Sequence, residues 1–226
     1  MLILSINIIL MLMLSRTIQS FSTFTLKSSF RAYSKNSYLC MKSVLVPIAT
    51  GSEEIETVCI IDTLVRSDAT VTVASIETEL LVTCSRGVNI KAEKFIKECS
   101  DSEFDMIVIP GGMPGAQRLS DCKILSDLLI KQNMEKKFIG SICAAPAVVL
   151  TELNLISESD KATCYPAPQF KEKIPYYSED NVVVNNNIIT SRGPGTALVF
   201  SLMLVEVLFG KERADQLANE MLVDRS

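Results

Sequence analysis

The segment Ser43–Ile76 reads SVLVPIATGSEEIETVCIIDTLVRSDATVTVASI. It begins with a short apolar run bounded by turn residues, which is typical of a buried parallel strand. A turn with Thr50 or Ser52 as candidate N-cap follows, then acidic residues and apolar residues at helical spacing. The last run, TVTVASI, predicts a second strand. The segment therefore predicts a strand–helix–strand unit, from which parallel sheets are built.

The rest of the chain continues this alternation without an internal repeat or a dividing linker. The expected strands are residues 105–112, 138–142, 162–164, 181–185 and 187–191, with a hairpin over 80–90. The expected helices are residues 117–134, 143–153, 193–210 and 211–223. This alternation predicts a single-domain α/β fold in which a mostly parallel sheet is sandwiched between helices.

Residues 1–41 differ in composition from the body, residues 42–226. Residues 1–15 form an apolar run of roughly 14 residues, which suits a signal-peptide core and is short for a membrane-spanning helix; a membrane anchor is the alternative. The following stretch is basic, acid-free and rich in Ser and Thr, as in transit peptides. We expect a targeting leader, removed to leave a body without membrane association. The expected destination is a plastid, with the mitochondrion, or the cytoplasm if translation starts at Met41, as alternatives.

The distribution of charge argues against nucleic acid as a partner. The chain has 22 Lys and Arg residues against 26 Asp and Glu residues, and every acid lies beyond residue 42. Such an acidic body lacks the clustered Lys and Arg residues that phosphate contacts require.

The chain contains no histidine. This excludes Ser-His-Asp and Cys-His nucleophilic arrangements, HExxH zinc sites and histidine-ligated metals within the chain. Its seven cysteines include no CxxC pair, which argues against a zinc ribbon or a thioredoxin-type motif. We expect reduced thiols, no metal and no cofactor.

Chemically active residue types follow three of the predicted strands. In open parallel sheets, ligands bind outside the carboxyl ends of the strands. These ends carry the acids Glu53, Glu54 and Glu56, the glycines of "PGG" at 110–112, and Cys143 in "SICAA". The glycines allow backbone N–H groups to approach an anion. A thiol at the start of a helix has a lowered pKa, so Cys143 is predicted to ionise near neutral pH beside a protonated carboxyl group.

The residues alone leave alternatives open at this edge. A single cysteine in apolar surroundings is often an inert packing residue. Acids in the first turn of a helix are common because they complement the helix dipole. Position therefore does not choose among the three acids.

Several longer motifs carry a family resemblance. The stretches GSEEIETV, VTCSRGV, DMIVIPGGMPGAQRL, GSICAAPAVVL, ATCYPA and TSRGPGTALVFSLMLVEVLFGKE lie in this order between residue 42 and about residue 223. They resemble the ThiJ/PfpI superfamily, and closely its branch that contains the parkinsonism-associated protein deglycase. The resemblance implies a flavodoxin-like fold, also described as class I glutamine amidotransferase-like, for everything but the leader.

The resemblance also implies a reactive centre. Cys143 corresponds to the family's reactive cysteine at a nucleophile elbow, and Glu56 to the carboxyl group that hydrogen-bonds its sulfur. Gly112 and Ala144 correspond to the positions whose backbone N–H groups form a small anion pocket.

Further positions are assigned by the same resemblance. Glu53 and Arg86 match a pair that meets near a subunit interface, which implies a homodimer, and Ser191 and Arg192 line the surroundings of the cysteine. Tyr165 stands where some relatives carry a histidine. That replacement argues against a Cys-His protease and leaves proton transfer to Glu56 or to the Tyr165 phenol, whose ordinary pKa near ~10 suits an acid better than a base.

The function implied is cofactor-independent detoxification of reactive dicarbonyls in defence against oxidative stress. Cys143 would attack methylglyoxal or glyoxal, in a glyoxalase III-type reaction, or a glycated adduct, in a protein or nucleotide deglycase reaction. The alternative is a redox sensor or stress chaperone without enzymatic activity, in which Cys143 is oxidised to a sulfinic acid. The same reactive thiol serves both functions, so the sequence does not separate them.

Overall fold

A seven-stranded sheet organises residues 41–225, the part of the chain that the computed structural model describes. The strand order is β10-β11-β7-β6-β1-β2-β5, and every neighbouring pair is parallel except β10 and β11. The strands are β1 (Ser43–Ile48), β2 (Thr70–Ser75), β5 (Lys94–Phe95), β6 (Met106–Ile109), β7 (Phe138–Ile142), β10 (Val182–Asn185) and β11 (Ile188–Ser191). The predicted mostly parallel sheet is thus confirmed. The leader predicted for residues 1–41 lies outside the described residues, except for Met41.

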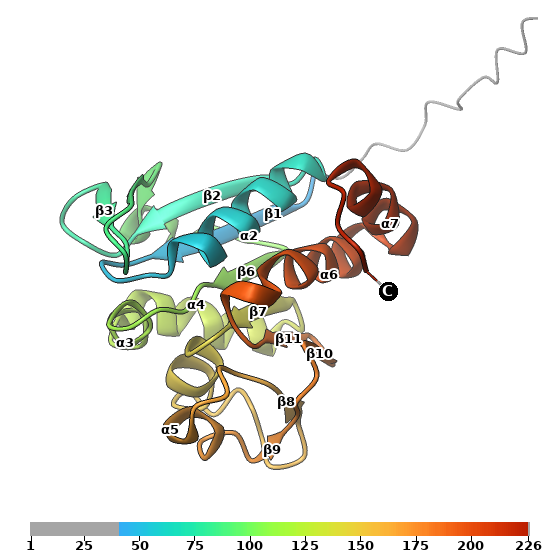
Figure 1. Cartoon of the computed structure of the whole chain (residues 1–226). Coiled ribbons are helices and arrows are strands. Elements are labelled where there is room, and N and C mark those ends of the chain that lie inside the picture. Colours follow the sequence, from blue (N-terminus) through green and yellow to red (C-terminus); the bar gives the residue numbers. More distant parts are fainter. Residues whose placement is uncertain (1–40, 226) are drawn as a thin grey trace, which may run out of the picture. The chain divides into compact units, whose positions relative to one another are not determined.

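Helices flank this sheet in two groups. α2 and α6 lie side by side, with α7 following α6, while α3 and α4 form a separate group (Figure 1). Gly140 on β7 faces α6, since a Cβ atom there would lie 2.9 Å from Leu204 and 3.3 Å from Phe200. The helices are α2 (Glu54–Arg66), α3 (Gly115–Ser120), α4 (Lys123–Met134), α5 (Pro168–Lys171), α6 (Ala197–Phe209) and α7 (Lys211–Glu220).

Short elements complete the described chain. The predicted hairpin is present as β3 (Leu81–Thr83) and β4 (Asn89–Lys91), which pair antiparallel. β8 (Lys161–Ala162) pairs with β9 (Tyr176–Tyr177). Three brief helical turns are η1 (Ile96–Cys99), η2 (Pro146–Leu150) and η3 (Pro194–Thr196).

The helix boundaries correct three predictions. The single helix expected over 117–134 is two helices, with Cys122 as the N-cap of α4. The N-cap of α2 is Glu53, whose side chain accepts a hydrogen bond from the Glu56 N–H, and neither Thr50 nor Ser52. The helix expected after Cys143 is η2, a π-helical turn of five residues.

The α2 helix presents an unexpectedly polar face to the core. Ile60 and Leu64 are fully buried, but Glu56 is buried with them. By contrast, about half of the side-chain surface of Val58 and Val65 remains exposed. This inverted pattern brings a carboxyl group beneath the carboxyl end of the sheet.

No helix among residues 41–225 is both long and apolar enough to span a membrane.

Candidate active site around Cys143

Cys143 lies at a sharp turn at the carboxyl end of β7. Its φ of +63° is in the left-handed region, which non-glycine residues seldom adopt. Its N–H donates to the Ser191 carbonyl on β11 at 3.0 Å, and its carbonyl accepts from the Tyr165 N–H at 2.7 Å. The chain is therefore held on both sides of the thiol, which fixes the strained turn. Cys143 is 8% exposed, so its side chain lies at the floor of an opening rather than on the surface.

Glu56 approaches the same point from α2. The Gly111 N–H donates to its Oε2 at 2.8 Å, while Oε1 is buried and has no hydrogen-bond partner among the described residues. A buried carboxylate oxygen without a donor is costly, because it has lost water and gained nothing in return. The arrangement therefore favours the protonated carboxyl group.

Two consecutive glycines allow Glu56 and Cys143 to come together. A Cβ atom at Gly111 would lie 2.5 Å from the Cys143 Cβ and 2.9 Å from Glu56 Oε2. Gly112 has a φ of +85°, and a Cβ atom there would lie 2.5 Å from the Glu53 nitrogen. Only a residue without a side chain fits at either position.

The two ionisable groups have coupled titrations. Burial raises the pKa of Glu56 to about 7, with a smaller contribution from the charge of Glu53, against the opposing effect of the hydrogen bond from the Gly111 N–H. Burial and the Glu56 charge raise the pKa of the Cys143 thiol. The predicted lowering of the Cys143 pKa by a helix start is thus wrong, because burial and the Glu56 charge outweigh the backbone N–H groups near the sulfur. Protonation of Glu56 near pH 7 removes the opposing charge and gives the sulfur a hydrogen-bond donor.

Backbone amides also reach the sulfur. The N–H groups of Gly112 and Ala144 hydrogen-bond to it and lower the pKa of the thiol, against the larger effect of burial. These are the two positions predicted to form an anion pocket. Donors that point at one atom in this way stabilise negative charge that develops there.

An open pocket of about 390 Å³ lies above the thiol. Tyr165 is part of its wall, and its ring meets Phe170 edge-on with centroids 6.4 Å apart. The tyrosine is 44% exposed, so it borders the entrance. The pocket is lined by Glu53, Ser85, Arg86, Gly112, Met113, Cys143, Ala144, Tyr165, Phe170 and Pro194.

Ser191 ends β11 and Arg192 follows it, beside this pocket. The Ser191 hydroxyl is buried and bonds to the Asn181 carbonyl and to Thr196 Oγ1, both at 2.7 Å. Its role in the structure is to support the turn that holds Cys143. Arg192 donates from Nη1 to the Glu179 carbonyl at 3.3 Å.

Glu53 and Arg86 line the same pocket but form no ion pair with each other among the described residues. Glu54 holds Arg86 in place, a role that the sequence analysis did not assign to it. Its carboxylate is 7% exposed and accepts hydrogen bonds from Ser85 Oγ and from the Arg86 N–H, both at 2.7 Å. Glu54 thereby fastens the β3–β4 turn to the start of α2.

Within residues 41–225, no group of three His, Cys, Asp or Glu side chains is arranged to hold a metal ion.

A mostly parallel sheet flanked by helices, with a cysteine in a left-handed turn at the end of a central strand, defines a flavodoxin-like α/β protein. The family model described as the DJ-1/PfpI family matches residues 42–207, and the chain belongs to this family.

Relatives and solved structures agree with that assignment. Protein DJ-1 homolog A of Arabidopsis thaliana is 42% identical over 186 residues, which cover 80% of this chain and 47% of that protein. The chain thus spans about half the length of this longer relative. The glutathione-independent glyoxalase DJR-1.2 of Caenorhabditis elegans is 39% identical over 78% of this chain and 94% of its own length. The structure of oxidised Toxoplasma gondii DJ-1 is 46% identical with a TM-score of 0.78, covering 80% of this chain and 98% of that one.

Proposed function

We propose that this chain converts small 2-oxoaldehydes, such as methylglyoxal and glyoxal, into 2-hydroxy acids without a cofactor. The observation that carries the proposal is the buried Glu56 carboxyl group, with a pKa raised to about 7 by burial, beside Cys143. A group that titrates near neutral pH can both give and take a proton during one turnover. The C. elegans relative is itself named a glyoxalase.

The reaction begins at the sulfur. The Cys143 thiolate forms a bond to the aldehyde carbon of methylglyoxal, and the carbonyl oxygen takes up the proton of Glu56 to give a hemithioacetal, which leaves Glu56 as a carboxylate. The amides of Gly112 and Ala144 stabilise the oxyanion that develops before this proton arrives.

Glu56 then moves a proton between the two carbons. Its carboxylate removes the proton from the carbon bonded to sulfur, and the resulting enediolate is protonated at the neighbouring carbon to give a thioester of lactate. Water cleaves the thioester, which releases lactate and restores the thiol. The net change adds one water molecule to methylglyoxal and needs no oxidant or reductant.

The test is the production of D- and L-lactate from methylglyoxal by the full chain and by its Cys143→Ala and Tyr165→Phe variants. We expect lactate from the wild type and none above background from Cys143→Ala. A wild type that forms no lactate contradicts the proposal. Reduced turnover in Tyr165→Phe would assign a proton transfer to the phenol.

Release of free lysine from glycated lysine, measured with the dicarbonyl removed by a scavenger, tests the deglycase variant of the same chemistry.

A redox sensor is the second candidate function, and the pocket above Cys143 supports it. Two amides directed at the sulfur can also hold the oxygens of a sulfinic acid formed by peroxide. This candidate requires mass spectrometry after mild peroxide treatment to find two added oxygen atoms on Cys143 alone, in a chain without turnover.

We further propose that the chain forms a homodimer, in which Glu53 of one subunit meets Arg86 of the other. Exposed apolar side chains along α2 support this, since Ile55, Val58 and Val65 each leave about half of their surface uncovered. Light scattering should give a dimer mass for the wild type and a monomer mass for Arg86→Glu. A dimer mass in Arg86→Glu that persists on dilution would contradict the proposed pairing.

Import into plastids, proposed from the leader, is tested by imaging a fluorescent fusion.

A further inference from the structure

A second hollow adjoins the Cys143 pocket. It has a volume of about 190 Å³ and shares Tyr165 and Pro194 with the larger pocket, so the two hollows are adjacent. Gly193 lies at their junction, where a Cβ atom would be 3.3 Å from the Tyr165 ring and 4.0 Å from the Cys143 sulfur. Because Gly193 has no side chain, no Cβ atom occupies the space between the Tyr165 ring and the sulfur.

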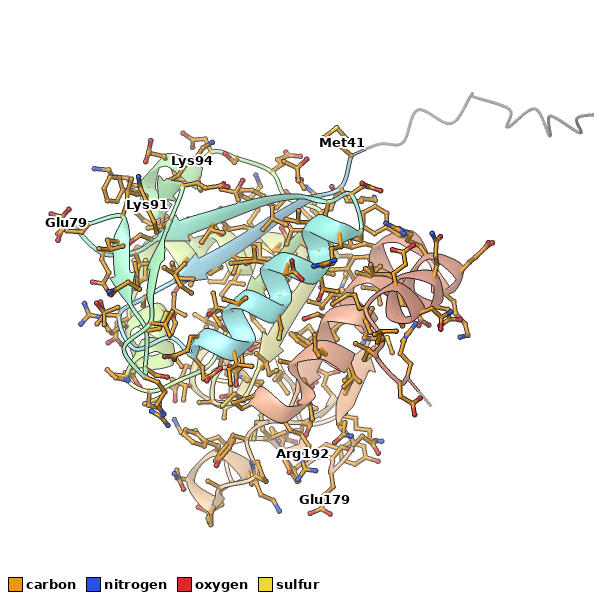
Figure 2. The ribbon with its side chains drawn as sticks, turned by 45° about the horizontal axis from the view of Figure 1, so that its top comes forward. Met41, Glu79, Lys91, Lys94, Glu179 and Arg192 are labelled. Carbon is orange, nitrogen blue, oxygen red and sulfur yellow. The ribbon has the colours of Figure 1, made fainter. Side chains whose placement is uncertain are left out.

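Arg192 is the one charged residue in the lining of this second hollow. Its Nη1 donates to the Glu179 carbonyl, and Figure 2 shows the two residues close together at one end of the molecule. Its Nε is shielded from solvent and has no acceptor among residues 41–225. No carboxylate in that range lies within 4.0 Å of the guanidinium, and the Glu179 carboxylate turns instead to Lys171 Nζ at 3.6 Å. A guanidinium group that has an N–H without an acceptor and no carboxylate nearby is suited to bind an external anion.

The larger pocket differs in its charge. It is lined by Arg86 together with Glu53, so the charges of these two side chains offset each other there. The second hollow has no acid in its lining. Of the two hydroxyl groups in its lining, those of Tyr165 and Thr196, Thr196 Oγ1 is already bonded to Ser191 and to the backbone of Gly193. A planar anion that needs one guanidinium therefore fits better than a phosphate group, which is usually held by several donors.

We propose that the site takes 2-oxoaldehydes that carry a carboxylate group, with the reactive carbonyl at Cys143 and the carboxylate at Arg192. This inference rests on the proposed function and specifies its substrate class. The larger pocket, about 390 Å³, exceeds methylglyoxal in size and adjoins a hollow that ends at an arginine without a carboxylate partner among residues 41–225, which suits such a longer molecule. Arg192 then acts on specificity, because it binds a part of the substrate that does not react.

The chemistry is the same for this class. A suitable probe is 4,5-dioxopentanoate, in which two methylene groups separate the dicarbonyl from the carboxylate. Addition of Cys143 to its aldehyde, transfer of one proton between carbons and hydrolysis by one water molecule give 2-hydroxyglutarate. The methyl ester of the probe has almost the same shape without the charge.

The experiment compares kcat/KM for the acid and for its methyl ester within each variant of the full chain. We expect the wild type to prefer the acid by about tenfold, as a charge-assisted hydrogen-bonded pair allows. The ratio should fall to about one in Arg192→Gln and recover in part in Arg192→Lys. It should persist in Arg86→Gln, and in Arg66→Gln as a matched control on the surface of α2. A wild type without preference, or a ratio lost in Arg86→Gln and kept in Arg192→Gln, overturns the proposal.

A binding measurement separates this inference from the proposed function. If no 2-oxoaldehyde is turned over, the proposed function fails, but Arg192 can still be tested in the Cys143→Ala protein. We expect the NMR signal of the Arg192 Nε–H group to shift when 4,5-dioxopentanoate is added and to stay in place with the ester. An Nε–H signal that does not respond to the acid overturns the proposal.

Discussion

Glu54 and Glu56 lie two residues apart at the start of α2, and both are buried, yet their pKa values move in opposite directions. Burial acts to raise the pKa of Glu54, but hydrogen bonds from Ser85 and from the backbone N–H groups of Arg86 and Val88 together hold it below its ordinary value. Glu56 receives one backbone N–H group, from Gly111, and its pKa is raised to about 7 by burial.

The difference lies in the number of donors each carboxylate meets. A carboxylate that accepts several hydrogen bonds stays ionised in the interior, whereas one that accepts a single bond does not. The hairpin side of α2 thus has a structural anchor in Glu54. The cysteine side has, in Glu56, a group that can exchange a proton near neutral pH.

The largest effect is expected from Glu56→Gln on turnover. A glutamine oxygen can still accept the Gly111 N–H, so the fold should be retained while proton transfer is lost. We expect kcat for methylglyoxal to fall by at least about 100-fold, in the range of general acid–base contributions. Circular dichroism serves as the control for folding. A folded variant with half of the wild-type kcat would show that Glu56 is not the proton carrier.

The next largest effect concerns stability against pH. Because the pKa of folded Glu56 is raised from 4.5 to about 7, the folded state keeps a proton that the unfolded chain releases between these values. This retained proton contributes roughly 3 kcal/mol to the free energy of unfolding. The contribution is complete below pH 4.5 and is lost as pH rises through 7. Urea unfolding at pH 4, 6 and 8 should show Glu56→Gln gaining stability relative to wild type only at the higher values. If the stability of Glu56→Gln differed from that of the wild type by the same amount at all three pH values, the raised pKa of Glu56 would be contradicted.

Glu54→Gln should lower the stability of the fold at pH 7, whereas Glu56→Gln is expected to raise it at the higher pH values. The amide group cannot replace a carboxylate that accepts from Ser85 and Arg86, and one buried N–H group would lose its acceptor. We expect a loss of about 2 kcal/mol in the free energy of unfolding at pH 7. The wild-type contribution is present above the ordinary pKa and disappears as pH falls through the lowered one. Glu172→Gln, an exposed acid, is the matched control.

This contrast marks the limit of what the sequence predicts. Periodicity predicted six of the seven strands of the sheet, including residues 138–142 in full, because buried parallel strands are short continuous apolar runs. It missed the two-residue edge strand β5, and the strand expected at 162–164 is β8, which pairs with β9 outside this sheet. It also placed Cys143 at the carboxyl edge. The residues by themselves left Glu53, Glu54 and Glu56 as equal candidates, and only the family resemblance selected Glu56.

The reason is geometric. The three acids cap the helix, anchor the hairpin and face the thiol, respectively, and these tasks depend on which strand ends lie opposite each side chain. Sequence spacing shows that they share a helix turn but not what faces them. The pKa of Cys143 was predicted in the wrong direction for a related reason, since the depth of burial and the unpartnered Oε1 of Glu56 arise from tertiary packing.

The smallest effect is expected from Ser85→Ala, which removes a single hydrogen-bond donor from Glu54. Its hydroxyl donates to Glu54 Oε2 at 2.7 Å, while its backbone N–H donates to the Ser52 carbonyl and is unaffected. Removing this donor should lower the free energy of unfolding by about 1 kcal/mol at pH 7. It should also raise the pKa of Glu54, so that Glu54 becomes more like Glu56. The cost should shrink as Glu54 is protonated in acid, which urea unfolding at pH 7 and pH 3 would measure, with Ser100→Ala as an exposed control. A cost that is the same at both pH values would mean that the hydroxyl contributes to packing and not to the charge of Glu54. The number of donors would then fail as the explanation for why two neighbouring acids differ.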